Sequence, residues 1–126
     1  MPKAKYNIMR DYRKYEVWVK AHQLTLYVYK EILPKFPKSE QYDLLSQCKR
    51  ATYSVPLNIV EGCGRGTDKD FAHFLDMAFG SVQEAEYCVL LAFDLEYLDK
   101  DSYNIANGKY NEVKAMLINL IKAIRK

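Results

Sequence analysis

The chain has 126 residues, of which 49% are hydrophobic, and a formal net charge of +3. These values predict a single domain over residues 1–126, with a core that needs neither disulfides nor a structural metal. The three cysteines are odd in number and widely spaced, which excludes a disulfide framework and indicates reduced thiols in a cytoplasmic protein. No apolar run approaches the ~20 residues of a membrane span, and we expect no signal peptide and no membrane partner.

The first part of the chain predicts one long helix. Residues 1–12 are polar, and we expect them to be loosely ordered. The first helix is predicted over residues 13–33, because apolar residues recur there at the spacing of one helix face. These residues are Val17, Ala21, Leu24 and Val28. Pro34 and Pro37 end the helix, and we expect Phe36 between them to close one end of the bundle.

The second helix is predicted to begin near Ser39, which would be its N-cap, and to end at the glycine-rich sequence EGCGRG of residues 61–66. Pro56 lies inside this segment. A proline in a helix interior lacks the backbone N–H and clashes with the preceding turn. The sequence therefore predicts a kink near Thr52, or a break into two helices.

Two further helices are predicted in the second half of the chain. The third begins at Thr67 or Asp68, with the Thr67 side chain placed to cap it, and reaches about Tyr97. Gly80 inside it is interpreted as a point of close packing. The fourth covers residues 101–125. Four amphipathic helices with short connections predict an all-α, up-down-up-down four-helix bundle with a Pro-kinked second helix.

Neither the histidines nor the cysteines favour catalysis. A di-iron site in a helical bundle needs Glu-x-x-His on two helices, which neither His22 nor His73 provides. Cys63 stands between glycines, but the sequence offers it no partner base. We therefore expect a protein that is not an enzyme and that uses no cofactor and no metal.

The charged residues are unevenly distributed along the chain. Residues 1–69 hold 13 of the 19 Lys+Arg and 7 of the 16 Asp+Glu, a balance of +6, whereas residues 70–126 hold 6 and 9, a balance of −3. A basic first half favours an anionic partner such as RNA or DNA. Alternatively, basic and acidic helices face each other or the solvent. The candidate nucleic-acid-binding residues are Lys49, Arg50, Arg65, Lys69, Arg13 and Lys14, with Lys49 and Arg50 as the first choice.

Tyrosines and glycines accompany these basic residues. The chain has 11 tyrosines, and aromatic side chains mixed with cations can bind single-stranded nucleic acid. Alternatively, the tyrosines line the edges of the bundle, with their rings inside and their hydroxyls in water. The EGCGRG sequence is interpreted as a helix end and tight turn, although a single phosphate could dock there with help from Arg65.

The second helix and its flanks carry a recognisable motif. The most specific part is SVPLNIVEGCGR, residues 54–65, preceded by LLSQCKRA at 44–51. Further matching strings are VWVKAHQL at 17–24, FP at 36–37 and FLDMAFGSVQEAE at 74–86. With these motifs the chain resembles the family of four helix bundle proteins. That family includes the proteins encoded by intervening sequences of bacterial 23S rRNA genes, and it is related to the accessory variability protein of diversity-generating retroelements.

The resemblance implies a ring of subunits, a homopentamer, without catalytic activity. It implies a possible partner in RNA, DNA or a nucleic-acid-processing protein, because the retroelement relatives bind a reverse transcriptase and nucleic acid. The motif residues Pro56, Asn58, Glu61 and Gly62 are interpreted as structural. Asn58 would satisfy the carbonyl that the proline frees or cap a neighbouring helix, and Glu61 would pair with Arg65 or with Arg50 of another subunit.

The sequence alone therefore supports two hypotheses about function. The first is a non-catalytic, oligomeric bundle that binds RNA or DNA or assists a ribonucleoprotein. The alternative is a scaffold that presents a surface to a partner protein.

Overall fold

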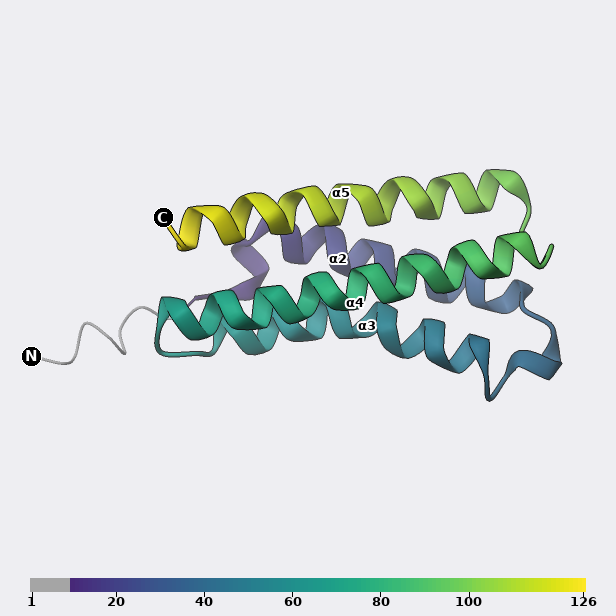
Figure 1. Cartoon of the computed structure of the whole chain (residues 1–126), viewed down its shortest axis with the longest axis horizontal. Helices are drawn as coiled ribbons and strands as arrows, with labels where there is room; N and C mark the ends of the chain where they lie inside the picture. The colour runs from purple at the N-terminus through teal and green to yellow at the C-terminus, as the bar shows by residue number, and fades with distance from the viewer. Residues whose placement is uncertain (1–9) are drawn as a thin grey trace, which may run out of the picture.

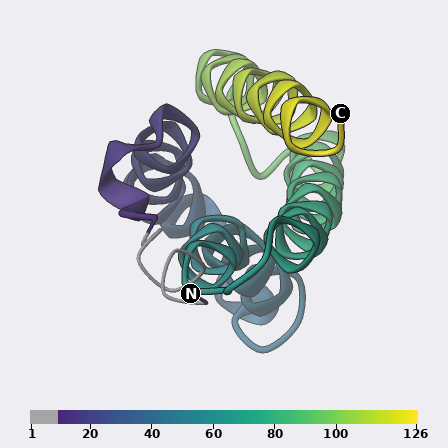
Figure 2. The same cartoon turned by 90° about the vertical axis from the view of Figure 1, so that its left-hand side faces the viewer.

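The computed structural model describes residues 10–126, which form four long antiparallel helices without a strand (Figure 1). The helices are α2 (Glu16–Tyr27), α3 (Leu44–Cys63), α4 (Asp68–Asp94) and α5 (Lys100–Ile124). Helices adjacent in the chain are neighbours in space, and α5 closes the bundle against α2 (Figure 2). The predicted up-down-up-down four-helix bundle is confirmed.

The first predicted helix is a composite of several turns. It opens with the 3-10 turn η1 (Tyr12–Lys14), in which the Asp11 carboxylate accepts a hydrogen bond from the Arg13 N–H at 3.1 Å. After α2 the chain continues through the π turn η2 (Val28–Ile32) and the 3-10 turn η3 (Leu33–Lys35). Phe36 is buried, and its ring centroid lies 5.8 Å from that of Tyr97, so its predicted place at one end of the bundle is confirmed.

The predicted start of the second helix at Ser39 is wrong. A 3-10 turn, η4 (Lys38–Glu40), comes first, and α3 begins at Leu44. The Glu40 carboxylate accepts a hydrogen bond from the Leu44 N–H at 3.1 Å. This side chain satisfies one of the free N–H groups at the helix start, the role predicted for Ser39, and the helix begins four residues later than predicted.

α3 runs as one helix through Pro56, so the expected alternative of a break into two helices is wrong. The proline frees the carbonyl of Thr52, four residues earlier. Asn58 does not satisfy that group as predicted, because its side-chain amide donates to the Ser54 carbonyl at 2.9 Å. Asn58 therefore reinforces the turn around the proline without replacing the missing bond.

The ends of α4 and α5 are fixed by side-chain caps. Thr67 Oγ1 accepts from the Asp70 N–H at 3.1 Å, which confirms the predicted cap of α4. The helix stops at Asp94 rather than near Tyr97, because Glu96 takes a left-handed backbone conformation with φ of 68°. Asp99 caps α5 by accepting from the Ser102 N–H at 2.9 Å.

Within residues 10–126, a hydrogen bond joins two polar side chains of the core. The Tyr110 hydroxyl and Thr52 Oγ1 are 2.9 Å apart, and both side chains are fully buried. The cysteines Cys48, Cys63 and Cys88 are free and buried. Burial raises the pKa of Cys48 to about 12 and the pKa of Cys63 to about 11, so these thiols stay protonated at neutral pH.

Candidate nucleic-acid interface

The turn between α3 and α4 depends on a close approach at Gly62. A Cβ atom at this position would lie 2.9 Å from Phe74 Cβ and 3.0 Å from Phe71 Cδ1. Only glycine leaves room for α3 and α4 to meet at this distance. This close approach is the physical reason for the structural role predicted for Gly62. The predicted close packing at Gly80 is wrong, because no atom beyond the adjoining residues and backbone of its own helix lies within 4 Å of a Cβ placed there.

Arg10 holds the beginning of the described chain against this turn. Its guanidinium lies over the Phe71 ring at 4.4 Å, donates to the Arg65 carbonyl at 2.7 Å and pairs with Asp68 at 2.6 Å. Its side chain is only 8% exposed. The predicted loose segment of residues 1–12 is therefore corrected at residues 10–12, where ion pairing and stacking order the chain, while residues 1–9 lie outside the described part.

The basic side chains Arg65 and Lys69 flank the same turn. The Arg65 guanidinium lies over the Phe74 ring at 4.5 Å. Lys69 lines a hollow of about 360 Å³ together with Asp68, Ile124, Arg125 and Lys126, where α4 begins and α5 ends. Sequence reasoning missed the contribution of α5 to this end of the bundle, since the contact depends on the tertiary packing.

Glu61 does not form the predicted ion pair with Arg65 within the described residues. Arg65 lies against Phe74 instead. The other predicted partner of Glu61, Arg50 of another subunit, stays a prediction.

Lys49 and Arg50 are neighbours in sequence but lie on different sides of α3. Successive residues of an α-helix are about 100° apart around its axis, so their side chains diverge. Lys49 turns towards η2, with its Nζ 5.7 Å from the Tyr29 ring centroid. The two residues that were predicted to act as a pair therefore present their charges at different places around the helix. Lys49 also lies about 20 Å along the helix axis from the turn that holds Arg65.

The remaining candidates, Arg13 and Lys14, lie in η1. The Arg13 guanidinium lies over the Tyr12 ring at 4.5 Å and is 3.7 Å from an Asp11 oxygen. Among the six candidates, Arg13 alone takes part in an ion pair within residues 10–126.

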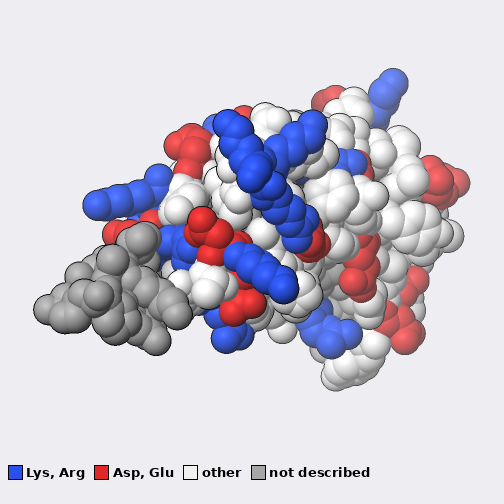
Figure 3. Space-filling view, turned by 60° about the vertical axis from the view of Figure 1, so that its left-hand side comes forward, with Lys and Arg blue, Asp and Glu red and all other residues white. Residues whose placement is uncertain are grey.

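Several other cations are neutralised by acidic partners. Ion pairs join α4 to α5 through Arg125 and Asp76 at 2.5 Å and through Lys114 and Glu86 at 2.7 Å. Figure 3 shows basic side chains gathered on one face, with acidic side chains between them. All six candidates except Arg13 carry exposed charges without such a partner in the described chain, and these charges are available to an anion.

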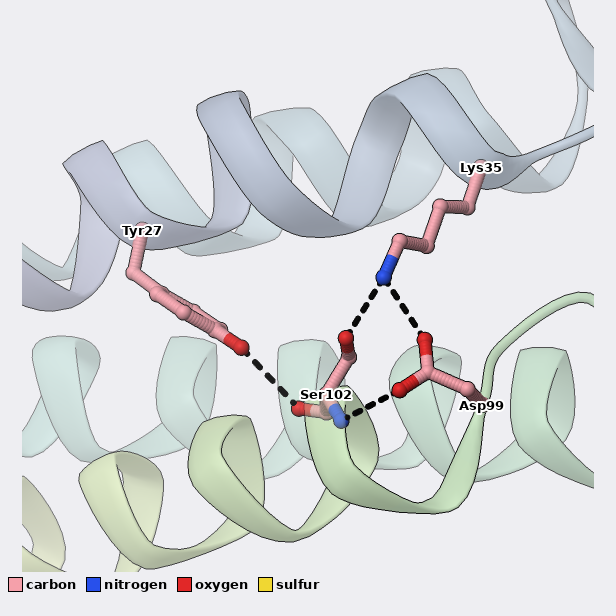
Figure 4. A network of polar contacts seen from close by, with 4 residues as sticks. All are labelled: Tyr27, Lys35, Asp99 and Ser102. Atoms are coloured by element: carbon pink, nitrogen blue, oxygen red, sulfur yellow. Dashed lines mark hydrogen bonds and ion pairs between the residues drawn. The ribbon is translucent and has the colours of Figure 1, made fainter.

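A polar network joins the end of the first helix to the start of α5 (Figure 4). Lys35 Nζ donates to Asp99 Oδ1 at 2.6 Å and to Ser102 Oγ at 2.5 Å. Contact of a lysine with a serine hydroxyl invites comparison with nucleophilic catalysis. The hydrogen bond to Asp99, however, raises the pKa of Lys35. Because the ammonium stays protonated, it cannot take the serine proton. The network therefore has a structural role, which is to link η3 to the start of α5.

This network of Lys35, Asp99 and Ser102 predicts that the stability of the protein depends on pH. The hydrogen bonds from Lys35 and then from Ser102 hold the pKa of Asp99 well below its ordinary value of 3.8. A lowered pKa adds stability at pH values above the ordinary pKa, and this contribution is lost as pH falls through the folded-state pKa. Asp99→Asn keeps a capping oxygen but removes the charge. We expect urea unfolding to find the variant less stable at neutral pH, with the difference shrinking below about pH 4. A difference that is constant with pH would contradict this account.

A shallow groove lies between α4 and α5. It has a volume of about 280 Å³ and is lined by Gln83, Glu86, Tyr87, Leu90, Tyr103 and Asn107. The rings of Tyr103 and Phe93 stack at 4.3 Å, which fixes one wall of the groove. Sequence reasoning gave no separate signal for this groove, because its residues come from two helices.

The described part of the chain contains no group of three or more His, Cys, Asp and Glu side chains that could hold a metal ion. None of its helices is long and apolar enough to cross a membrane.

Comparison with known proteins adds two findings. Residues 13–119 match the family model described as 23S rRNA-intervening sequence protein. The chain is also similar to a crystal structure from Bacteroides thetaiotaomicron, a protein of unknown function from the S23 ribosomal protein family. The TM-score is 0.64 at 24% identity, covering 97% of this chain and 99% of the other, and this likeness bears on the fold. No curated protein matches the chain.

Proposed function

We propose a function from the premise that this chain belongs to the 23S rRNA-intervening sequence protein family. The protein is a non-catalytic, oligomeric helical bundle that binds RNA or DNA. The observation that carries the proposal is that five of the six candidate cations are exposed and form no ion pair within residues 10–126: Lys14, Lys49, Arg50, Arg65 and Lys69. Cations that form no ion pair remain free to replace the counterions of a phosphate backbone.

The proposal that the protein is not an enzyme has its own support. The thiols of Cys48 and Cys63 are buried and have raised pKa values, and Lys35 is held protonated beside Ser102. Neither group is prepared for nucleophilic attack. The free thiols also support the proposed location in the cytoplasm.

We propose that the working unit is a homo-oligomer, which the family resemblance implies to be a pentamer. Large apolar side chains that a monomer leaves in water support this proposal. Tyr87 is 59% exposed, and Leu90 and Ile118 are 38% and 39% exposed, on the helices that form the α4–α5 groove. Tyr87 and Leu90 line the same groove, and neighbouring exposed apolar side chains are typical of surfaces that another protein covers. A second copy on this side would leave the α2–α3 side free.

Binding of a labelled RNA or DNA oligonucleotide at increasing salt tests the proposed function. We expect measurable affinity at low salt and a logarithm of the binding constant that falls linearly with the logarithm of the salt concentration. Joint charge reversal, Lys49→Glu with Arg50→Glu, should weaken binding and reduce the salt slope by about one unit for each phosphate that the variant no longer neutralises. Lys122→Glu, at an exposed site of α5, is the matched control. Absence of binding even at low salt would refute the proposal.

The α4–α5 groove favours the alternative of a protein-interaction scaffold. Its Tyr87 and Leu90 could receive an apolar side chain of a partner protein, while Gln83 and Asn107 offer hydrogen bonds at its rim. A partner that is recovered with the protein after nuclease treatment, and is no longer recovered with a Tyr87→Ala variant, would favour the scaffold over nucleic-acid binding.

A further inference from the structure

Aromatic side chains follow one another along the outer side of η1 and α2. The Tyr12 ring meets the Trp18 ring edge to face at 4.9 Å. Trp18 stacks on His22 at 5.0 Å, with only 7° between the ring planes. Arg13 lies over Tyr12 at 4.5 Å, so a cation stands at the beginning of this series.

Two further tyrosines continue the series between α2 and α3. Tyr29 and Tyr53 are 39% and 38% exposed. Tyr53 lies four residues after Lys49 on the same face of α3. Burial, and then Tyr53, raise the pKa of Tyr29. Lys49 Nζ lies 5.7 Å from the Tyr29 ring centroid, so a second cation stands at this end.

These side chains share one side of the bundle. Trp18 and His22 are four residues apart and Tyr29 follows seven residues later, which is the spacing of one helix face. From Trp18 to Tyr29 the helix rises about 16 Å. The aromatic row, which we define as Tyr12, Trp18, His22, Tyr29 and Tyr53, therefore extends along the α2–α3 side with Arg13 and Lys49 beside it.

We propose that the aromatic row is a stacking surface for single-stranded nucleic acid, an inference that rests on the proposed function. Unpaired bases expose their flat faces and stack on aromatic rings, while cations beside the rings meet the phosphates. A duplex hides the faces of its bases and would meet only the cations. The site therefore selects single strands over duplexes, with little dependence on base sequence.

Exposed leucines also lie on these two helices. Leu26 is 41% exposed and Leu57 is 50% exposed, and such side chains alone would suit a protein partner. The cations beside the row decide the choice, because Arg13 lies over the Tyr12 ring, and Lys49 lies near the Tyr29 ring without an acidic partner in the described residues. Stacking rings combined with uncompensated positive charge match a nucleic acid better than an apolar protein surface.

Trp18 is the one tryptophan of the chain and reports on the row directly. We expect a short single-stranded RNA or DNA to change the Trp18 fluorescence as it binds, with RNA and DNA titrated separately to show which is preferred. A duplex of the same sequence should bind more weakly and change the fluorescence less. Stronger binding of the duplex, or binding that leaves the fluorescence unchanged, would overturn the inference.

Variants that leave Trp18 in place complete the test. Tyr29→Leu combined with Tyr53→Leu removes two rings but keeps apolar bulk, and it should weaken single-strand binding at least about fivefold. Lys49→Gln, at an exposed position, should weaken binding without risk to the fold, whereas Lys122→Gln on α5 should not. If the double tyrosine variant and Lys49→Gln both bound single strands with wild-type affinity, the inference would be overturned. The proposed function, salt-dependent binding of nucleic acid, would then still hold for another part of the surface. Absence of all binding would refute the proposed function with it.

Discussion

Gly62→Ala is expected to destabilise the bundle, although alanine forms helices better than glycine. The added methyl would meet Phe74 Cβ at 2.9 Å and Phe71 Cδ1 at 3.0 Å. The first of these atoms is fixed to the backbone of α4 and cannot turn away. Overpacking of this kind costs about 1–3 kcal/mol, which exceeds the up to about 1 kcal/mol gained by replacing a helical glycine. Urea unfolding followed by circular dichroism measures the change.

Gly80→Ala is the matched control for this prediction. It makes the same substitution inside α4, where no atom beyond the adjoining residues and backbone of that helix lies within 4 Å of the new Cβ. We expect it to stabilise the protein by up to about 1 kcal/mol. If Gly62→Ala were as stable as Gly80→Ala, the close approach of α3 and α4 would not have the importance assigned to it.

Tyr110→Phe is expected to destabilise the core by about 1–3 kcal/mol. The substitution removes the hydroxyl that lies 2.9 Å from Thr52 Oγ1 and leaves that oxygen buried without this partner. A buried polar group that loses its partner has been taken out of water without compensation. The free energy of unfolding, measured with urea, gives the size of the destabilisation.

A double-mutant cycle isolates the interaction between the two residues. Thr52→Val combined with Tyr110→Phe removes both hydroxyls and leaves no unpaired oxygen. We therefore expect the double variant to be less destabilised than the sum of the two single variants. Additive effects would show that the hydroxyls contribute independently and that their hydrogen bond adds nothing.

Helical periodicity in the sequence is enough to predict the bundle. Its apolar seams, such as Val113 and Leu117 on α5, are fully buried in the structure. The ends of helices are harder to predict. The sequence offers Ser39 as a cap for the second helix, whereas Glu40 takes this role for Leu44 through its longer side chain. Which of two neighbouring polar residues reaches the free N–H depends on the preceding turn, which the sequence does not specify.

The candidate interface is predictable as a set of residues but not as a surface. Lys49 and Arg50 are adjacent in the sequence, yet only Lys49 faces Tyr29. Arg10 falls in a segment predicted to be loose, although Asp68 and Phe71, far away in the sequence, hold it in place. Such interactions arise from tertiary packing, and for the same reason a glycine at position 62 is constrained while one at position 80 is not.

Native mass spectrometry with a short single-stranded RNA tests the central claim most directly, because it reports assembly and binding together. The account predicts a multiple of the 14.7 kDa chain, five copies by the family resemblance, that carries RNA at low ionic strength and releases it as salt is added. A 14.7 kDa monomer that carries no RNA under the same conditions would contradict it.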